Sequence, residues 1–283
     1  MTYYLPVFGA VMLAAGTILE RLVLKGKKVG IRSYQVASFL AIVIAISPFL
    51  YFFWKLDSQA LEIGNILIFL VVILFALLAN LLVFYSLKWE KVTNLEPARV
   101  LEPLFVILLV IIFSLFTEGI YAKNPKIILP AIIASLTLVF SHISKHHLKF
   151  NKYFIAAVLG SLFFALELVI SRLILDFYSP ISFYFFRSAS ILILSFIIFR
   201  PSFKQLDTQT KGIVFVTGII WTIYRVIIYY GYLSIGIVFT TLILMLGPVF
   251  IYIFAHFFLR EKMSWRNFVA AIIIVGSIIY ALV

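Results

Sequence analysis

The chain has 283 residues, of which 64% are apolar and only 12% are charged, and its formal net charge is +12. A soluble domain carries about twice that charged fraction, so the composition predicts a protein whose solvent and partner is the lipid bilayer. There is no cysteine, which excludes disulfides and thiolate metal sites. The basic residues fall mostly in short connections between apolar runs, as is typical of membrane proteins, and they do not indicate a nucleic-acid partner.

Ten apolar runs follow one another along the chain, each near the roughly 20 residues that a helix needs to cross the hydrocarbon. The first run lacks the basic start and the small-residue cleavage site of a signal peptide, so it is predicted to be a span. The runs are continuous rather than alternating, which excludes a transmembrane barrel. The predicted spans lie near 4–24, 34–54, 64–87, 95–116, 127–143, 153–175, 181–200, 211–234, 238–259 and 265–283.

The two halves of the chain resemble each other. Six pairs of residues align at one constant offset: Tyr85 with Tyr230, Leu101 with Leu246, Pro103 with Pro248, Phe105 with Phe250, Asn80 with Arg225 and Glu102 with Gly247. The predicted repeats cover residues 1–144 and 152–283, with five spans in each. Because five is odd, the second repeat must be inverted in the membrane, and a site between inverted repeats is the common architecture of secondary transporters.

Short motifs recur in both halves. They are Glu102-Pro103-Leu104-Phe105 in the fourth span, Gly247-Pro248-Val249-Phe250 in the ninth, a later turn glutamate in each half (Glu118 and Glu261), the turn 260–264, and the basic residue Arg187 in the seventh span. Together these motifs resemble the drug/metabolite transporter superfamily, specifically its EamA-type members with ten helices. The resemblance implies two EamA-like five-helix repeats. It also implies a carrier rather than an enzyme, without a cofactor.

The connecting segments predict how the chain is oriented. Those that follow odd-numbered spans, here called side A, hold most of the lysines and arginines, and the opposite connections, side B, hold few. Basic loops stay in the cytoplasm, so we expect side A, including the loop Lys145–Lys152, to be cytoplasmic and both termini to lie outside. Members of the family usually have a cytoplasmic N-terminus, so the loop charges and the family habit disagree.

Several ionisable residues fall inside the predicted spans, where a charge costs at least about 2.5 kcal/mol and needs a partner or a polar cavity. Glu167, Arg187 and Arg225 lie at one depth on spans six, seven and eight when the helical rise is applied. We therefore expect Glu167 and Arg225 to approach within hydrogen-bond or one-water distance. Glu20, together with Arg99 and Glu102 of the fourth span, forms a second group nearer side A.

The predicted binding site is a cavity between spans 1, 3, 4, 6, 8 and 9. Arg225 would hold an anionic group such as a carboxylate, and Asn80, its equivalent in the first repeat, would supply an amide. Trp221 and Tyr224 lie too centrally for an interfacial aromatic belt and would flank the solute.

Glu167 and Arg187 complete the predicted substrate-binding set. Glu102 would carry a proton if transport is proton-coupled, and Pro97, Pro103 and Pro248 would interrupt helix hydrogen bonding in or near the spans. No metal site is predicted. Tyr229 and Tyr230 fit the interfacial belt.

Structural alternatives apply to the same residues. Buried Glu–Arg pairs also hold helices together without binding a solute, and Glu96 and Arg99 are spaced to pair on one helix face. Arg21 and Arg172, near span ends, can extend to the interface. The proline breaks also fit plain kinks that improve packing.

The leading functional hypothesis is a secondary carrier of the plasma membrane, most naturally an exporter, for small polar metabolites such as amino acids. The first alternative is a flippase for lipid-linked headgroups, which needs a lateral opening between helices. The second is a membrane enzyme acting on lipid substrates, but the three aspartates are scattered. No nucleotide-binding motif appears. The oligomeric state stays open, and a monomer is compatible with the sequence.

Overall fold

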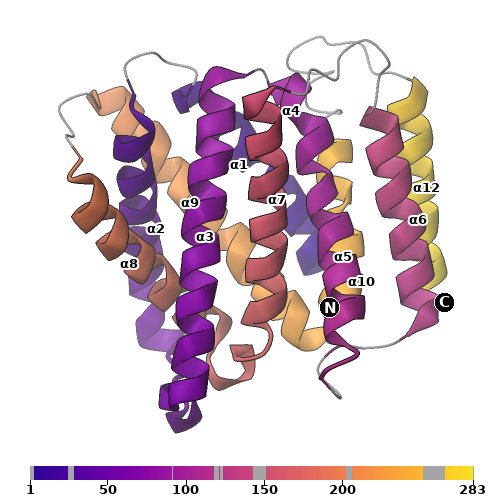
Figure 1. The fold of residues 1–283 in the computed structure, drawn as a ribbon, viewed down its shortest axis with the longest axis horizontal. Helices are drawn as coiled ribbons and strands as arrows, with labels where there is room; N and C mark the ends of the chain where they lie inside the picture. Colours follow the sequence, from indigo (N-terminus) through magenta and orange to yellow (C-terminus); the bar gives the residue numbers. More distant parts are fainter. Residues whose placement is uncertain are drawn as a thin grey trace.

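The structure is a computed structural model that describes residues 3–24, 29–90, 92–117, 121, 124–142, 151–201, 206–250 and 265–282. Apart from turns and one isolated β-bridge, the described chain is helical (Figure 1), which confirms the predicted all-α class. Five predicted features lie partly or wholly outside these residues: the turn glutamates Glu118 and Glu261, the turn 260–264, the end of the ninth span, most of the loop Lys145–Lys152, and the end of the first repeat at 144.

Six described helices are long and apolar enough to cross a membrane, and each matches a predicted span. They are α1 (Tyr4–Leu24), α2 (Ile31–Phe53), α3 (Ile63–Trp89), α7 (Lys152–Ser171), α8 (Pro180–Phe199) and α9 (Thr208–Ser234). The sixth span was predicted too long, because the chain leaves the α-helix after Ser171 and forms a turn and the short 3-10 helix η2 (Leu175–Phe177).

Two further predicted spans appear as 18-residue helices, α6 (Pro125–His142) and α12 (Trp265–Leu282). The sequence prediction treated the fourth span as one continuous helix, and the structure corrects this. The span consists of α4 (Val92–Arg99) and α5 (Leu101–Phe113), which are separated at Val100.

Proline explains this break and a second one. The ring nitrogen of Pro103 cannot donate to the carbonyl of Arg99, where α4 ends. Pro248 stands in the same relation to Leu244, where α10 (Ile237–Leu244) ends before helix resumes beyond Met245. The hypothesis that Pro103 and Pro248 interrupt their spans is confirmed. Pro97 lies inside α4 without breaking it.

Side-chain caps fix where three helices of the second half begin. The Asn151 side chain accepts hydrogen bonds from the amides of Tyr153 and Phe154 at the start of α7. Ser179 caps α8, with Pro180 next to it, and Asp207 caps α9. Each cap satisfies amides that have no partner within the helix, so helix starts near the membrane surface can be read from local sequence.

The long helices pack in pairs, with α3 against α7, α1 against α9, α2 against α8, and α6 against α12. Two glycines permit close crossings. A Cβ on Gly160 of α7 would lie 2.8 Å from Val83 of α3, and one on Gly218 of α9 would lie 2.7 Å from the Cβ of Ala41 of α2. Small residues at helix crossings are typical of membrane proteins, because close backbone approach supplies the packing energy that lipid does not.

On side B, residues 53–57 pair with residues 176–182. Leu56 and Tyr178 form an antiparallel β-bridge. It is flanked by hydrogen bonds from the Asp57 amide to the Phe177 carbonyl, at 2.8 Å, and from the Ser179 amide to the Lys55 carbonyl, at 3.4 Å. This side-B clamp joins the connection after α2 to the connection before α8.

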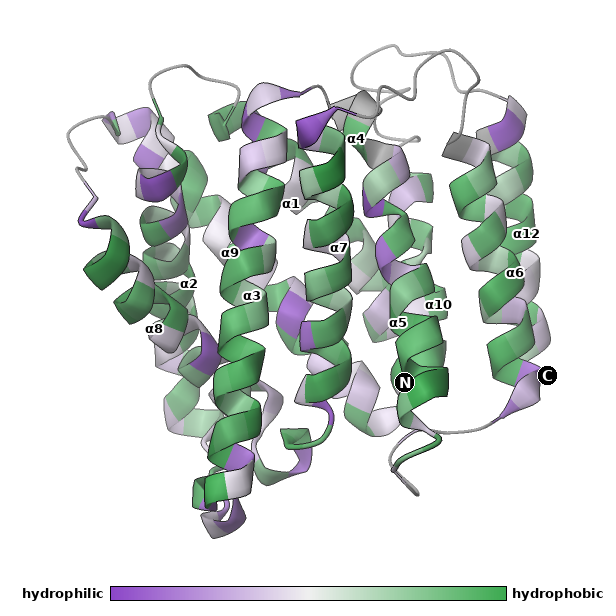
Figure 2. Cartoon of the chain, in the orientation of Figure 1, coloured by the Kyte–Doolittle hydropathy of each residue, from purple (hydrophilic) through white to green (hydrophobic). Residues whose placement is uncertain are grey.

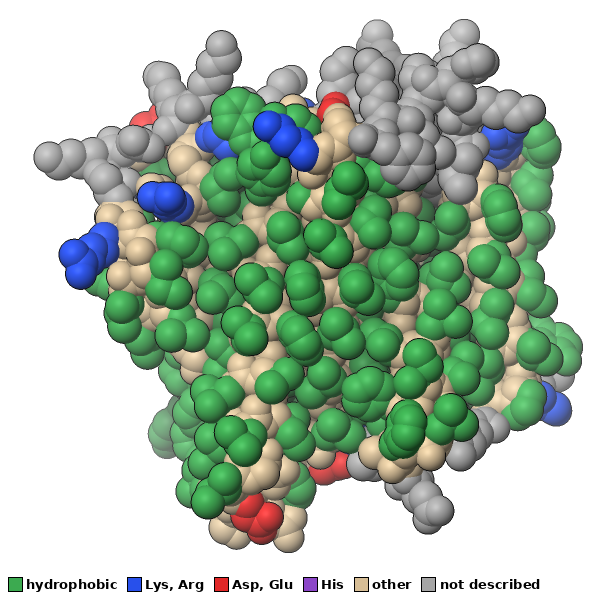
Figure 3. All heavy atoms as spheres, viewed as in Figure 1, with side chains coloured by type: hydrophobic (Ala, Val, Ile, Leu, Met, Phe, Trp, Pro, Cys, Tyr) green, Lys and Arg blue, Asp and Glu red, His purple; other side chains and the backbone are tan. Residues whose placement is uncertain are grey.

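The surface is apolar across its middle. Polar residues gather toward the helix ends (Figure 2), and the face in Figure 3 is covered by hydrophobic side chains between an upper edge with lysine and arginine and a lower edge with acidic residues. A soluble protein rarely exposes so large an apolar surface. Both termini lie on the side of the lower edge, away from the basic side A (Figure 1).

Candidate functional site

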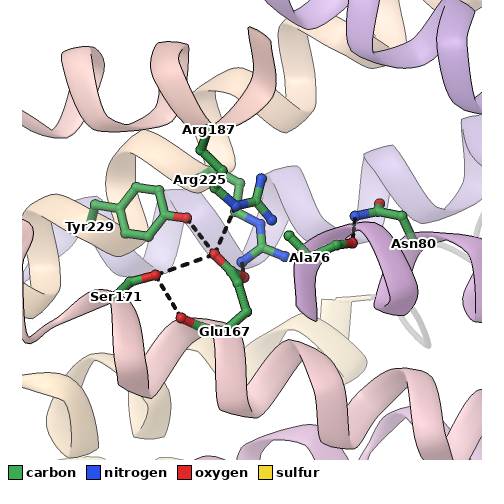
Figure 4. A network of polar contacts seen from close by, with 7 residues as sticks. All are labelled: Ala76, Asn80, Glu167, Ser171, Arg187, Arg225 and Tyr229. Carbon is green, nitrogen blue, oxygen red and sulfur yellow. Dashed lines mark hydrogen bonds and ion pairs between the residues drawn. The ribbon is translucent and has the colours of Figure 1, made fainter. Parts of the chain in front are cut away.

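The centre of the bundle holds a buried ionic network around Glu167 of α7 (Figure 4). Its carboxylate oxygen Oε1 lies 2.8 Å from Nε of Arg187 on α8, and Oε2 lies 3.1 Å from Nη1 of Arg225 on α9. The hydroxyl of Tyr229 donates to Oε1 at 2.8 Å. Ser171 donates to the backbone carbonyl of Glu167 at 2.6 Å. One carboxylate thus joins three helices.

The predicted approach of Glu167 and Arg225 is confirmed by this geometry. The Glu167 side chain is fully buried, and those of Arg187 and Arg225 are 2% and 8% exposed. Removing one partner from such a pair leaves an uncompensated charge in a medium that solvates it poorly. The network is therefore a strong constraint on how α7, α8 and α9 pack, whatever else it does.

Aromatic rings surround the two arginines. The guanidinium carbon of Arg225 lies 4.9 Å from the ring centre of Phe164, and that of Arg187 lies 5.6 Å from the ring centre of Tyr184. These distances are within the range of cation–π attraction. Ring faces and one carboxylate thus accommodate two cations in the apolar interior.

Two adjoining cavities open beside this network. The first encloses about 680 Å³ and the second about 610 Å³, counting space open to the outside. They share the lining residues Leu13, Arg99, Glu102 and Tyr224.

The second cavity brings together most of the predicted site residues. They are Asn80, Glu102, Arg187, Trp221, Tyr224 and Arg225. Glu167 does not line this cavity but pairs with two residues that do. The helices that contribute to the two cavities include all six predicted spans, and α2 and α8 contribute as well through Ser38 and Tyr184.

The second half of the chain, residues 151–283, matches the sequence model of the EamA-like transporter family. Residues 151–283 thus belong to the EamA-like transporter family. This family belongs to the drug/metabolite transporter superfamily, and its members are transporters. No curated protein matches the chain. One solved crystal structure covers 99% of this chain and 96% of its own with a TM-score of 0.68 at 17% identity, a likeness that concerns the fold alone.

Asn80 has a local hydrogen bond. Its amide nitrogen donates to the carbonyl of Ala76 in the same helix at 2.7 Å (Figure 4), as asparagine in a helix often does. It lines the second cavity with Arg225 but does not join the ionic network.

The two neighbouring tyrosines near the end of α9, both predicted to lie in an interfacial belt, have different surroundings in the structure. Tyr230 is 44% exposed and fits an interfacial belt, whereas Tyr229 is fully buried and donates to Glu167. The belt interpretation of Tyr229 was wrong because the packing of α9 against α1, α2 and α8, not the position of Tyr229 near the end of the span, decides its surroundings. Trp221 and Tyr224 contact each other edge to face, with ring centres 5.3 Å apart, beside the cavity.

The structure adds three residues to the predicted set: Thr17, Glu20 and Arg99. Thr17 of α1 lines the first cavity and accepts a hydrogen bond from Nη2 of Arg99 at 3.2 Å. Glu20, one turn further along α1, lines the second and is 4% exposed. The sequence grouped Glu20 and Arg99 with Glu102 by depth, but it did not place Glu20 or Arg99 in the predicted binding site.

Proposed function

We propose that this EamA-like transporter is a secondary carrier that moves a small polar metabolite, such as an amino acid or a related solute, out of the cell across the plasma membrane. The observation that carries the proposal is the central cavity lined by charged and aromatic side chains. In an apolar helical bundle, ionisable residues facing a cavity are characteristic of substrate and ion pathways.

The mechanism we propose is alternating access between inverted five-helix repeats, residues 1–144 and 152–283. The helix pairings support it. In the proposed repeats, α1, α2, α3 and α6 correspond to α7, α8, α9 and α12. If each helix is replaced by its equivalent, the α3–α7 pair becomes α9–α1, which is also observed, and the α2–α8 and α6–α12 pairs map onto themselves. The aligned prolines Pro103 and Pro248 support it too, because each interrupts its span at the equivalent position. Broken helices at a repeat interface are typical of transporter binding sites.

In this proposal Arg225, Asn80, Trp221 and Tyr224 contact the solute. Glu167 and Arg187 belong to the same site and hold Arg225 in place through the network. Glu102, which faces both cavities, carries a proton if transport is coupled to a proton gradient.

Counterflow in proteoliposomes tests the function. Purified protein is reconstituted, loaded with an unlabelled solute from a panel of amino acids and related metabolites, and scored for uptake of the labelled solute. Wild-type exchange that is absent from empty liposomes supports the carrier. With the exchanged solute in hand, Arg225→Ala, Asn80→Ala and Glu102→Gln should each lower the rate or change its pH dependence.

Asn65→Ala is the matched control for Asn80→Ala, because Asn65 lies half-buried on the same helix, near side B, and lines neither of the two cavities. All variants must first elute as a single folded species. If the three site variants exchange solute at the wild-type rate with unchanged pH dependence, the site assignment is wrong, although a carrier with a different site remains.

A flippase for lipid-linked headgroups is the second candidate, favoured by a separate observation. An apolar cavity of about 730 Å³, counting open space, lies between α2 and α9 and is lined by Leu40, Ile44, Val214 and Phe215, with Lys211 among its lining residues. An apolar space with a lysine beside it suits an acyl chain with an anionic headgroup. Translocation of a fluorescent lipid in the same proteoliposomes, without solute counterflow, would favour this candidate.

A further inference from the structure

The first cavity lies where two spans are interrupted. One wall comes from the break between α4 and α5 and the other from the break after α10. Its polar residues include Thr17, Arg99 and Glu102, and its apolar residues include Val106, Leu168, Ile228, Leu244, Met245 and Pro248. Because Glu102 aligns with Gly247 and Arg99 with Leu244, charge stands at the break in the first repeat and apolar surface at the break in the second. The cavity is therefore amphipathic.

Arg99 differs from the other two central arginines in its partners. Arg187 and Arg225 share the Glu167 carboxylate. Arg99 forms no ion pair with any carboxylate whose side chain the structure describes, and Nη2 donates only to Thr17. Its other terminal nitrogen, Nη1, is buried and has no hydrogen-bond partner there. An unsatisfied buried donor is unfavourable, more so when charged, so this guanidinium is prepared for an anionic ligand.

We propose that Arg99, rather than Arg225, binds the carboxylate of the transported solute. The inference rests on the proposed carrier function and names the anchoring residue and the chemical class of ligand. A guanidinium presents a planar set of donors that matches a carboxylate. The apolar wall of Leu244 and Met245 receives the hydrocarbon body of the solute, and a solute ammonium faces Glu102.

Charge balance supports a zwitterion over a simple anion. The cavities and the network contain three arginines (Arg99, Arg187, Arg225) and three glutamates (Glu20, Glu102, Glu167). With all six ionised the site is neutral, and a zwitterion leaves it neutral. A lone anion would add a net charge inside a medium that penalises it.

The test measures preference for a carboxylate rather than total transport. The probe is the amino acid that gives the fastest wild-type counterflow, and the competitor is either the same amino acid or its C-terminal amide, which lacks the carboxylate. Wild type and Arg225→Gln should prefer the acid over the amide by about tenfold or more, the size of a hydrogen bond to a charged group. Arg99→Gln should lose this preference, and Arg99→Lys should keep part of it.

A ratio of two competitors does not depend on how much protein is folded, so a merely structural role for Arg99 would not change it. Should Arg99→Gln fail to fold, Arg99→Lys decides, because an unchanged preference would contradict a contact that depends on the planar guanidinium. A wild-type preference in Arg99→Gln, or its loss in Arg225→Gln, overturns the assignment while the carrier function stands. Absence of counterflow for every amino acid overturns both the proposed amino-acid carrier and the inference.

Discussion

Substituting Glu167 by glutamine is the sharpest test of the central network. The change keeps the shape of the side chain and removes the negative charge that Arg187 and Arg225 share. Removing one partner of a buried pair costs about 3–5 kcal/mol, and here two arginines lose their partner at once. By contrast, Arg187→Gln leaves the pair between Glu167 and Arg225 intact. Glu167→Gln should therefore be the most destabilising of the single changes in the network.

The double variant Glu167→Gln/Arg187→Gln sharpens the expectation. It leaves one unpaired arginine in place of two, so its loss of stability should be smaller than the sum of the two single losses. Residues in one network typically couple by about 0.5–3 kcal/mol. Additivity of the two changes would show that the ion pair contributes nothing beyond its separate side chains.

These differences are measured as melting temperatures of the purified protein in detergent, taken from the fraction of protein that stays monodisperse after heating. For a chain of this size roughly 2–4 °C corresponds to 1 kcal/mol, so Glu167→Gln should lower the melting temperature by roughly 6–20 °C. Glu62→Gln is the control, because Glu62 is exposed on side B and its side chain makes no capping bond. A Glu167→Gln protein that melts within about 2 °C of wild type would refute the reasoning, since the pair would then carry about 1 kcal/mol or less.

Three further expectations concern the clamp, a helix crossing and the orientation. Leu56 and Tyr178 are a non-hydrogen-bonded antiparallel pair, whose Cα atoms are about 4.5 Å apart and within disulfide reach. The chain has no cysteine of its own, so the Leu56→Cys/Tyr178→Cys double variant can form one defined disulfide. Oxidising this variant should stop counterflow, and adding reductant should restore it. Unaltered transport in the fully cross-linked protein would mean that side B does not open at the clamp. Gly218→Ala should lower stability by about 1–3 kcal/mol through overpacking against α2, whereas Gly212→Ala, with nothing within 4 Å, should not; equal melting temperatures would contradict the close crossing. A C-terminal reporter that is active only in the cytoplasm should be silent, because the basic connections place side A inside, and an active reporter would reverse the orientation.

Much of this architecture follows from the sequence because its determinants act locally. The length of an apolar run sets whether a helix can span the bilayer, and the energetic penalty of a buried charge requires Glu167 and Arg225 to find partners. The helical rise places those two residues at one depth, so their pairing could be predicted. The breaks at Pro103 and Pro248 follow from a missing amide and act only four residues back along the chain.

Only the tertiary structure decided which face each helix turns inward. Tyr229 and Tyr230 are neighbours in sequence, yet one donates to Glu167 and the other is 44% exposed, because the rotation of α9 in its packing against α1, α2 and α8 separates them. The same holds for Arg99, whose local spacing suggested a partner one turn earlier, and whose described contact is with Thr17 of α1. Helix rotation and crossing are set by packing between residues far apart in the chain, such as Gly218 against Ala41. Composition and periodicity in a single sequence do not encode that packing in a form that can be read.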